Sequence, residues 1–232
     1  MLLSVPRVVA FDTVGSTLDI AHELGARDAD AGTLILANAQ TAGRGRHGKR
    51  WRSESGAGIW LTLVERPRDV AALDVLSVRV GLTLAPALDR FANDMVRLKW
   101  PNDLYLGRGK LAGVLVEARW RADAPDWVAI GVGINTRVPD GERAASLQAG
   151  TSRAEVLRQA VPAIRAAAHR AGLLDSAELA RFVGRDLAAG RECTEPVRGR
   201  VRGIDRAGAL VVDADGVTTT VRAGSLVLKE DL

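Results

Sequence analysis

The stretch that most strongly indicates the fold and function of this chain is Gln40-Thr41-Ala42-Gly43-Arg44-Gly45-Arg46-His47-Gly48-Lys49-Arg50-Trp51. It mixes three glycines with five basic or potentially basic side chains and ends in a tryptophan. Glycine lets backbone N–H groups approach a ligand, and arginine supplies forked donors that match phosphate and carboxylate oxygens. The composition therefore predicts an anion-binding loop. Three occupants stay open at this point: solvent alone, a nucleic-acid backbone, or a small phosphate ligand.

The overall composition is that of an ordinary globular protein. The 232 residues include 47% hydrophobic residues, and 32 Lys and Arg stand against 28 Asp and Glu. This length suits one large domain, or one domain with a small companion. The net charge of +4 is mild, so a general nucleic-acid-binding surface is not predicted. The local concentration of charge in the basic loop carries more information than the total.

Cysteine usage and hydropathy indicate the compartment. Cys193 is the single cysteine, so no internal disulfide can form, and we expect a small packing residue in a reducing environment. The first residues do not have the pattern of a signal peptide. No stretch approaches the roughly 20 apolar residues that a membrane span needs. We therefore expect a cytoplasmic protein with no membrane partner.

Hydrophobic patterning predicts a mixed α/β region in the first four fifths of the chain. The expected strands are 7–13, 32–37, 58–65, 96–100, 104–106, 110–118 and 127–134. The expected helices are 17–25, 70–91 as one helix or a pair with an interruption near Pro86, 152–171 with a kink or break at Pro162, and 176–189. Ser16 or Thr17 is the expected N-cap of the first helix, with Asp19 completing a capping box.

The tail has a different pattern. Short Val- and Thr-rich segments separated by glycines predict strands at 197–204, 209–213, 217–222 and 227–229. Such a tail predicts a small all-β barrel. The expected fold is thus α/β of the α+β kind, with a mixed-sheet domain over 1–188 and a β-domain over 189–232.

Three further patches carry polar residues at turns or strand ends, where ligand groups tend to gather. They are Ser16-Thr17, Lys99-Trp100-Pro101-Asn102-Asp103 and Lys110-Leu111-Ala112-Gly113. Each also has a purely structural explanation: a helix cap, a proline turn with common turn residues, and a lysine at a sheet edge.

Several kinds of catalytic site are not indicated. The three histidines, His22, His47 and His169, are far apart and lack a second ligand at metal-binding spacing. No G-x-x-x-x-G-K-[ST] or G-x-S-x-G string occurs. The chemistry must then rest on lysines, arginines, backbone donors and one carboxylate, a set that suits charge stabilisation at phosphorus.

Four motifs together resemble those of biotin protein ligases. The basic loop is similar to the family's GRGRxGRxW loop, and residues 99–103 match its KWPND motif. Residues 110–117 look like its KxxGILxE strand, and residues 131–135 like its GxGIN strand. The motifs occur in the family's order from Ser16 to about Asn135, and the β-rich tail resembles the family's C-terminal SH3-like domain. Only some 15 residues precede Ser16, so the resemblance is to the monofunctional type without an N-terminal DNA-binding domain.

The resemblance implies a two-step reaction. Biotin and ATP, with Mg²⁺, form biotinyl-5′-AMP and pyrophosphate, and biotin is then transferred to a lysine of a biotin carboxyl carrier protein, as in acetyl-CoA carboxylase. No DNA partner is expected, and a homodimer is left open.

The resemblance also assigns roles to residues. The implied catalytic residues are Lys110, Arg46 and Asp103, and Asp103 is implied either as a base for the acceptor lysine or as a ligand of Mg²⁺. The implied biotin-binding residues are Ser16, Thr17, Gln40, Gly43, Arg44, Gly45, Arg46, Lys110 and Gly113. The implied ATP-binding residues are Arg44, Arg46, Trp51, Lys99, Asn102 and Asn135.

Two departures from the family pattern and two alternative functions remain. Leu18 stands where the family often has asparagine. Lys49 stands where the family commonly has arginine, and lysine cannot form the two parallel hydrogen bonds that arginine can. A lipoate ligase or an octanoyltransferase has a related fold, but it does not have the GRGRxGRxW loop followed by the KWPND motif. A nucleic-acid-binding module that uses the basic loop belongs to a different class.

Overall fold

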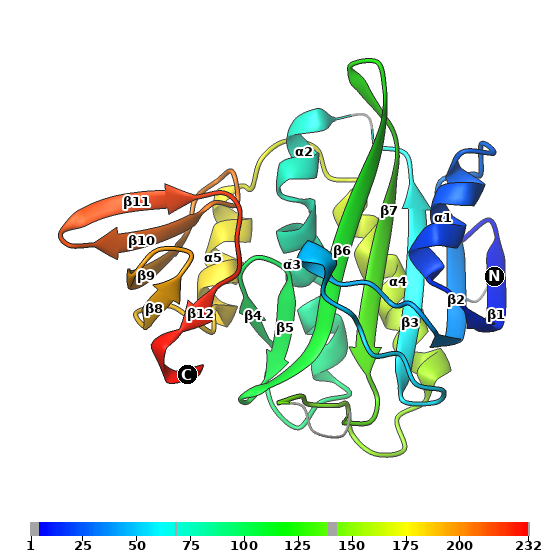
Figure 1. Cartoon of the computed structure of the whole chain (residues 1–232), viewed down its shortest axis with the longest axis horizontal. Helices are drawn as coiled ribbons and strands as arrows, with labels where there is room; N and C mark the ends of the chain where they lie inside the picture. The colour runs from blue at the N-terminus through cyan, green and yellow to red at the C-terminus, as the bar shows by residue number, and fades with distance from the viewer. Residues whose placement is uncertain (1–4, 68, 139–142, 232) are drawn as a thin grey trace.

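The computed structural model describes residues 5–67, 69–138 and 143–231, and their strands form two separate sheets (Figure 1). In spatial order the first sheet contains β1 (Val8–Val14), β2 (Thr33–Gln40), β3 (Gly58–Glu65), β7 (Ala124–Asn135), β6 (Gly109–Arg121), β5 (Asp103–Leu106) and β4 (Arg97–Lys99). β1 runs parallel to β2, and the other neighbouring pairs are antiparallel. The expected mixed sheet is therefore confirmed.

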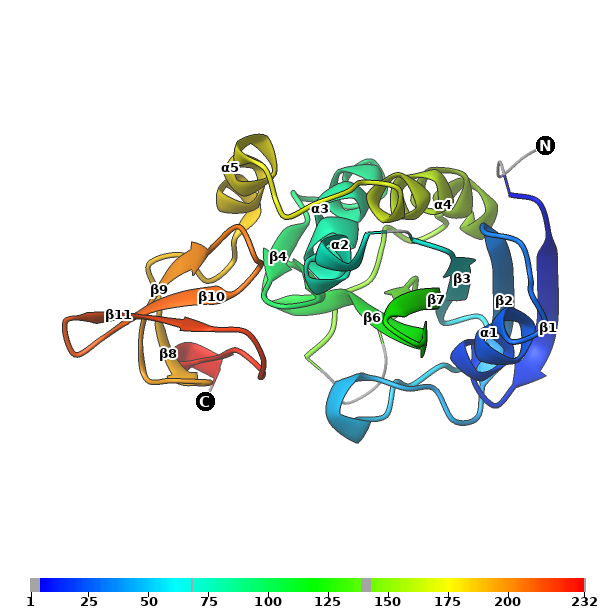
Figure 2. The same cartoon turned by 90° about the horizontal axis from the view of Figure 1, so that it is seen from above.

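Helices cover the two faces of this sheet unequally. α2 (Val70–Asp74), α3 (Leu76–Asp89) and α4 (Arg153–Ala168) lie along one face, and α1 (Thr17–Gly25) lies on the other (Figure 2). The larger core lies under α3 and α4, and a smaller one forms where α1 buries Leu18 and Ala21 against Ile35 and Val64. The basic loop, with a short 3₁₀ turn η1 (Arg46–Gly48), is on the same side as α1 (Figure 2).

The interruption expected near Pro86 was wrong, and of the kink or break expected at Pro162 the break does not occur. The helical region 70–91 is divided at Val75, whereas Pro86 lies inside α3 and Pro162 lies inside α4. A proline inside a helix costs about 3 kcal/mol locally. α3 and α4 pack on each other and bury continuous apolar faces, and burial on this scale outweighs the local cost.

The start of α1 also differs from expectation. Ser16 is the N-cap, but its hydroxyl accepts from the N–H of Leu18. The carboxylate of Asp19 pairs with Arg44 of the basic loop instead of completing a capping box. The helix start is therefore tied to the loop.

The second sheet is antiparallel and built from the tail. Its order is β11 (Val217–Val221), β10 (Leu210–Ala214), β9 (Gly199–Ile204), β8 (Glu192–Glu195) and β12 (Val227–Leu228), followed by the turn η2 (Lys229–Asp231). Sequence patterning missed β8, which has two glutamates among its four residues. Among the described strands, β11 and β12 stand at opposite ends of the order, so this sheet does not close into the expected barrel. Cys193 is buried in its core, as expected.

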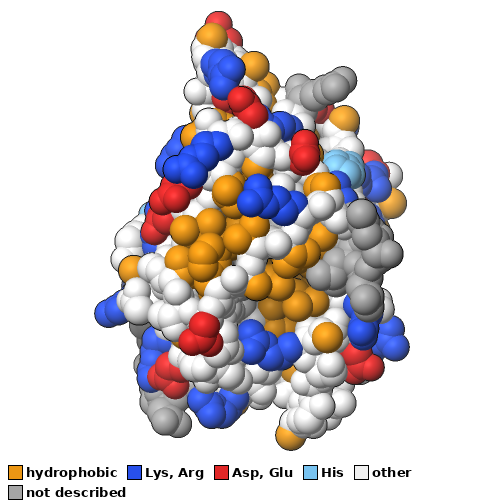
Figure 3. All heavy atoms as spheres, turned by 90° about the vertical axis from the view of Figure 1, so that its right-hand side faces the viewer, with side chains coloured by type: hydrophobic (Ala, Val, Ile, Leu, Met, Phe, Trp, Pro, Cys, Tyr) orange, Lys and Arg blue, Asp and Glu red, His pale blue; other side chains and the backbone are white. Residues whose placement is uncertain are grey.

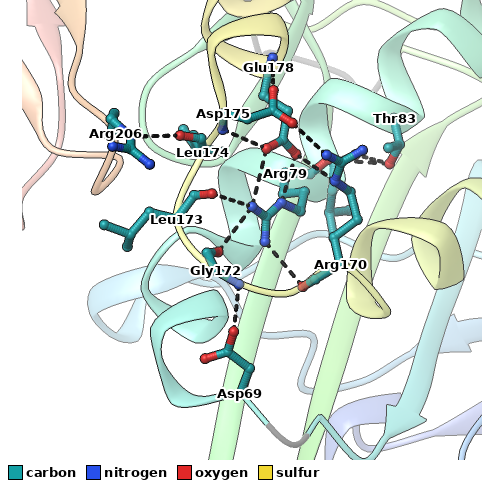
Figure 4. Close-up of polar contacts among 11 residues, drawn as sticks. Asp69, Arg79, Thr83, Arg170, Gly172, Leu173, Leu174, Asp175, Glu178 and Arg206 are labelled. Atoms are coloured by element: carbon teal, nitrogen blue, oxygen red, sulfur yellow. Dashed lines mark hydrogen bonds and ion pairs between the residues drawn. The ribbon is translucent and has the colours of Figure 1, made fainter.

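A buried ionic network joins the helices to the second sheet (Figure 4). Arg79 of α3 donates to both carboxylate oxygens of Glu178 in α5 (Ser176–Arg185), at 2.8 and 3.2 Å. It also donates to the carbonyls of residues 170, 172 and 173. Leu174 in the same connection exchanges two hydrogen bonds with Arg206, in the turn between β9 and β10. The network thus fixes the path from α4 to α5 and the position of the second sheet.

The face beyond β1 is the free edge of the first sheet. Hydrophobic side chains gather there between Lys and Arg side chains (Figure 3), and Val8 of β1 is 47% exposed. None of the described helices has the length and hydropathy needed to cross a membrane.

Candidate active site

A cavity of about 480 Å³ opens beside the basic loop, over the middle of the first sheet. Its walls come from the start of α1, the end of β2, the basic loop, strands β5 to β7 and the 225–227 segment that leads into β12. All four sequence motifs contribute to these walls, so segments that are far apart in the sequence, from Ser16 to Val227, meet at one place.

One end of the cavity is a fixed polar network. Gln40 accepts hydrogen bonds from the Thr17 N–H at 2.8 Å and from the Thr17 hydroxyl at 3.1 Å. The buried Thr62 hydroxyl donates to the Thr17 oxygen at 2.8 Å, and the Gln40 amide donates to Ser53 at 2.8 Å. Each side chain holds the next, so this end is formed before any ligand arrives.

The floor of the cavity is made by glycines beneath a tryptophan. Gly113 of β6 pairs with Gly133 of β7, and the Trp51 ring lies over both. A Cβ would lie 2.9 Å from the ring at Gly113 and 2.6 Å from it at Gly133, both too close for a side chain. Glycine at these two positions is therefore what lets the loop tryptophan pack onto the sheet.

Lys110 lies at the centre of the charged wall. Its ammonium is 2.7 Å from the Asp103 carboxylate and 5.1 Å from the centre of the Trp51 ring. The Asn135 side chain donates to the Lys110 carbonyl at 3.1 Å and to the Ala145 carbonyl at 3.2 Å. The lysine is thus held both through its charge and through its backbone.

The turn that contains Asp103 is anchored on both sides. The Trp100 indole packs into the core of the second sheet and donates to the Gly208 carbonyl at 2.9 Å. The Asn102 amide donates to the Val114 carbonyl at 2.7 Å, and Lys99 lies over the Tyr105 ring. The peptide bond between Trp100 and Pro101 is cis. The motif therefore connects the cavity to the tail of the chain.

The two loop arginines reach the cavity in different ways. Arg46 donates to the Gly224 carbonyl of the tail at 3.1 Å and lies 3.5 Å from the Asn102 side chain. Its burial lowers the pKa of the Arg46 guanidinium from its usual value, and the nearby charge of Asp103 opposes that change. Arg44 is more exposed and pairs with Asp19 and Glu117 on the rim. Together with Lys99 and Lys110 they make the cavity cationic, which suits a ligand with several negative charges.

The described residues contain no group of three His, Cys, Asp or Glu side chains that would hold a metal ion by itself. Asp103 contributes one carboxylate to the cavity wall. Mg²⁺ commonly binds through one or two carboxylates together with substrate phosphates and water. The donor set therefore fits Mg²⁺ that arrives with a polyphosphate, and Asp103 is the side chain that would hold it.

The structure brings most of the sequence-predicted site residues together. Ser16, Thr17, Gln40, Arg44, Gly45, Arg46, Trp51, Lys99, Asn102, Asp103, Lys110 and Gly113 all line the one cavity. Gly43 and Asn135 lie outside its lining. Gly43 approaches the Trp51 carbonyl so closely that a Cβ would lie 2.4 Å from it, and Asn135 is buried beneath Lys110. Both therefore support residues that line the cavity.

Sequence reasoning missed several lining residues. Leu61 on β3 and Val132 on β7 add apolar surface, and Leu18 packs against Gly131, where a Cβ would lie 3.2 Å from its side chain. Leu61 and Val132 fall in expected strands and Leu18 in an expected helix, but the patterning gave no sign that a cavity would meet them. Residues 225–227 of the tail also line the cavity, and no motif marks them.

Comparison with known proteins defines the class. Residues 10–135 match the model of the biotin/lipoate A/B protein ligase family, and the chain belongs to this family. Within it, the chain is 33% identical over 222 residues to the bifunctional ligase/repressor BirA of Escherichia coli (strain K12), which covers 86% of this chain and 67% of BirA. It is 32% identical to the biotin–[acetyl-CoA-carboxylase] ligase of Mycobacterium tuberculosis (strain H37Rv), over 90% of this chain and 88% of that protein.

A solved structure supports the same fold. The biotin protein ligase from Aquifex aeolicus in complex with biotin and ATP superimposes with a TM-score of 0.79, covering 97% of this chain and 99% of that one. The sequence identity is 24%, so this likeness concerns the fold.

Proposed function

We infer that this chain is a biotin protein ligase, which activates biotin with ATP and transfers it to a lysine of a biotin carrier such as that of acetyl-CoA carboxylase. Two relatives are named biotin–[acetyl-CoA-carboxylase] ligases, which makes the lipoate alternative the less favoured one. The observation that carries the inference is the single cavity in which Arg44, Arg46 and Lys110 face an apolar floor beside a preformed polar end.

In the first step a biotin carboxylate oxygen attacks the α-phosphorus of ATP. The bond between the α-phosphorus and the bridging oxygen breaks, and pyrophosphate leaves. Two anionic groups must approach each other, and cations placed where charge accumulates lower that barrier. We assign this role to Lys110, with Arg44 and Arg46 closing over the same oxygens. The Asp103 ion pair holds Lys110 in the cavity wall.

Biotin is proposed to bind across the floor of the cavity. Its ureido group would meet the polar end formed by Ser16, Thr17 and Gln40, where the donors and acceptors are already fixed. Its ring and aliphatic chain match the apolar surface of Trp51 and the two floor glycines. Gly45 in the loop would admit the carboxylate to backbone N–H groups.

ATP is proposed to bind on the charged side. Lys99, Asn102 and Trp51 line that part of the cavity, and the buried Trp51 indole N–H has no hydrogen-bond partner among the described residues. A ligand acceptor would bind the indole N–H, and adenine would stack on the flat face of the ring. Asn135, which lies beneath Lys110, is proposed to act on the nucleotide through that lysine. Asp103 would hold Mg²⁺, which would neutralise part of the triphosphate charge.

In the second step the acceptor lysine amine attacks the carbonyl carbon of the adenylate. The bond between that carbon and the phosphate oxygen breaks, AMP leaves, and the amine loses a proton. We propose Asp103 as the acceptor of this proton, the alternative to its role toward Mg²⁺. A second hollow, lined by residues 42–50 with Leu115 and Glu117, shares several of the cavity's lining residues, and we propose that an incoming carrier docks there.

The decisive test is pyrophosphate release with ATP and either biotin or lipoate, followed by transfer to a purified biotin carrier domain. We expect release with biotin that requires Mg²⁺, and little release with lipoate. Release with lipoate alone would overturn the inference. A mobility-shift assay with duplex DNA tests the nucleic-acid alternative, for which we expect no binding.

Three finer proposals concern organisation. We propose a boundary between the two domains at residues 188–189, because α5 ends at Arg185 and β8 begins at Glu192. We also propose action in the cytoplasm, and a homodimer as the assembly to be tested. Limited proteolysis tests the boundary, fractionation tests the compartment, and light scattering with and without biotin and ATP tests the assembly.

A further inference from the structure

A second line of polar side chains runs behind the basic loop to Arg44, and its other members have no part in the chemistry above. Arg44 Nη2 lies 3.3 Å from Glu117 Oε2 on β6. His22 Nε2 on α1 lies 2.7 Å from that same oxygen. Trp127 Nε1 on β7 lies 3.2 Å from His22 Nδ1. Four elements thus contribute to one chain of contacts that ends at a cavity arginine.

The direction of these hydrogen bonds is set by their donors. An indole N–H only donates, so His22 Nδ1 accepts from Trp127. The other ring nitrogen of His22 then carries the proton and donates it to Glu117. Glu117 Oε2 accepts from His22 on one side and from Arg44 on the other. A neutral His22 satisfies every member of the chain.

The inner end of this chain is rigidly packed. A Cβ on Gly25, at the end of α1, would lie 2.5 Å from Trp127 Nε1, so glycine there is what lets the indole reach His22. Exposure rises outward, from 11% for the His22 side chain to 24% for Glu117 and 37% for Arg44. This series of hydrogen bonds therefore connects Arg44, on the rim of the cavity, to side chains that are fixed in the core.

Arg44 needs such support because its own loop gives it little. Its two neighbours in the chain are Gly43 and Gly45, which offer no side chains to pack against. A long arginine side chain loses conformational entropy when it must hold one position for a ligand. Among the described residues only its Nη2 is hydrogen-bonded or ion-paired, which leaves Nε and Nη1 available to an anion.

We propose that His22 and Glu117 are positioning residues that hold Arg44 in place for the acyl-phosphate of the adenylate. This rests on the proposed function, because Arg44 is assigned to the adenylate there. Without the two residues Arg44 samples more orientations, and the adenylate is released faster. The effect requires no contact between either residue and the substrate.

The test measures how fast the full chain releases its own adenylate. Enzyme is loaded with labelled biotin and ATP, excess unlabelled biotin and ATP are added, and loss of bound label is followed in time. The dissociation rate constant does not depend on the folded fraction, so a purely destabilising substitution does not change it. His22→Leu is expected to speed release about 10-fold, by analogy with the lower end of the effects seen when outer supports of metal ligands are removed.

Conservative and control variants sharpen the result. His22→Gln keeps an N–H that can donate to Glu117, so release close to the native rate is expected. Glu117→Gln keeps an acceptor for Arg44 but loses the negative charge that faces it, and an increase of about 3-fold in the release rate is expected. Glu23→Gln removes an exposed charge from the same helix, with no change expected.

Unchanged or slower release in both His22→Leu and Glu117→Gln would overturn the proposal. Slower release would mean that the two residues hold Arg44 away from the adenylate. If His22→Leu does not fold, Glu117→Gln decides alone. Native enzyme that never accumulates adenylate would overturn the proposed function instead, and this inference with it.

Discussion

Two arginine–glutamate pairs in this molecule use the same chemistry for different ends. Arg79 and Glu178 are each 1% exposed, and Arg79 makes five hydrogen bonds through all three of its side-chain nitrogens (Figure 4). Arg44 and Glu117 lie on the rim of the cavity, and a single Arg44 nitrogen carries the contacts described. The first pair is complete without a ligand, whereas the second keeps donors open.

The difference teaches how to separate structural from functional charge. A buried guanidinium is tolerated only when its donors are matched, because an unpaired buried charge is very costly. A guanidinium that must bind substrate needs the opposite: one fixed nitrogen and free donors beside it. The count of matched donors, together with exposure, distinguishes the two arginines better than the presence of an ion pair does.

Breaking the buried pair should give the largest effect. Glu178→Gln leaves Arg79 uncompensated, and we expect a loss of about 3–5 kcal/mol in the free energy of unfolding. Denaturant unfolding of the purified chain measures it. Asp213→Asn, which disrupts an exposed pair with Arg202, is the control and should change stability little. Equal losses in the two variants would mean that burial does not decide the strength of these ion pairs. KM for biotin and ATP should stay unchanged in both.

The same pair predicts a dependence on pH. Burial by itself raises the pKa of Glu178, but hydrogen bonds from Arg79 and the Asp175 backbone, together with nearby positive charge, lower it overall. A lowered folded-state pKa stabilises the protein above the unfolded pKa of about 4.3, and that stability is lost as pH falls through the folded value. The melting temperature should therefore fall as the pH drops below about 4.3, and it should fall less steeply in Glu178→Gln. An identical acid profile in that variant would assign the loss to other carboxylates.

The next effect concerns catalysis at Lys110, in the charged wall of the cavity. Lys110→Met removes the charge at the proposed carboxylate–phosphate junction, and we expect the rate of adenylate formation to fall about 10²- to 10³-fold. Single-turnover pyrophosphate release measures it. Lys229→Met, which changes an exposed lysine at the end of the tail, is the matched control. A rate within a few-fold of native in Lys110→Met would remove that lysine from the chemistry.

The motifs predicted which segments would meet, because glycine-rich and proline-containing turns fix where polar residues emerge from strands. Four segments expected at strand ends do line one cavity. The patterning could not show that Trp100 belongs to the core of the second sheet, because its alternation is that of any strand residue. Breaks at Pro86 and Pro162 do not occur for a related reason: local propensity does not report the packing of α3 on α4.

Contacts between side chains that are far apart in the sequence also could not be predicted from it. His22 reads as a lone histidine on a helix, and only the fold places it between Trp127 and Glu117. The entry of residues 225–227 into the cavity depends on how the second sheet docks, which no local pattern encodes. The missing information is in each case long-range packing.

A smaller effect is expected at the preformed polar end. Thr17→Val keeps the shape of the side chain but leaves the buried Thr62 hydroxyl without its acceptor and Gln40 with one donor fewer. A lost buried hydrogen bond costs about 1–2 kcal/mol, which corresponds to roughly a 10-fold rise in KM for biotin. Steady-state kinetics should show little change in KM for ATP. Thr83→Val, which removes a hydroxyl from α3 that bonds only within its helix, is the control.

The smallest expected effect tests whether contact distance or burial decides how strongly a carboxylate orients Arg44. Asp19 lies closer to Arg44 than Glu117 does, 2.9 Å against 3.3 Å, but its side chain is 54% exposed against 24%. Water screens exposed ion pairs, which contribute about 0–1 kcal/mol, so Asp19→Asn should change adenylate release less than about 2-fold. Glu117→Gln should have the larger effect because His22 fixes its carboxylate from the protein side. If Asp19→Asn were instead the more disruptive variant, contact distance would govern the orientation of Arg44, and the ordered chain behind Glu117 would have no influence on it.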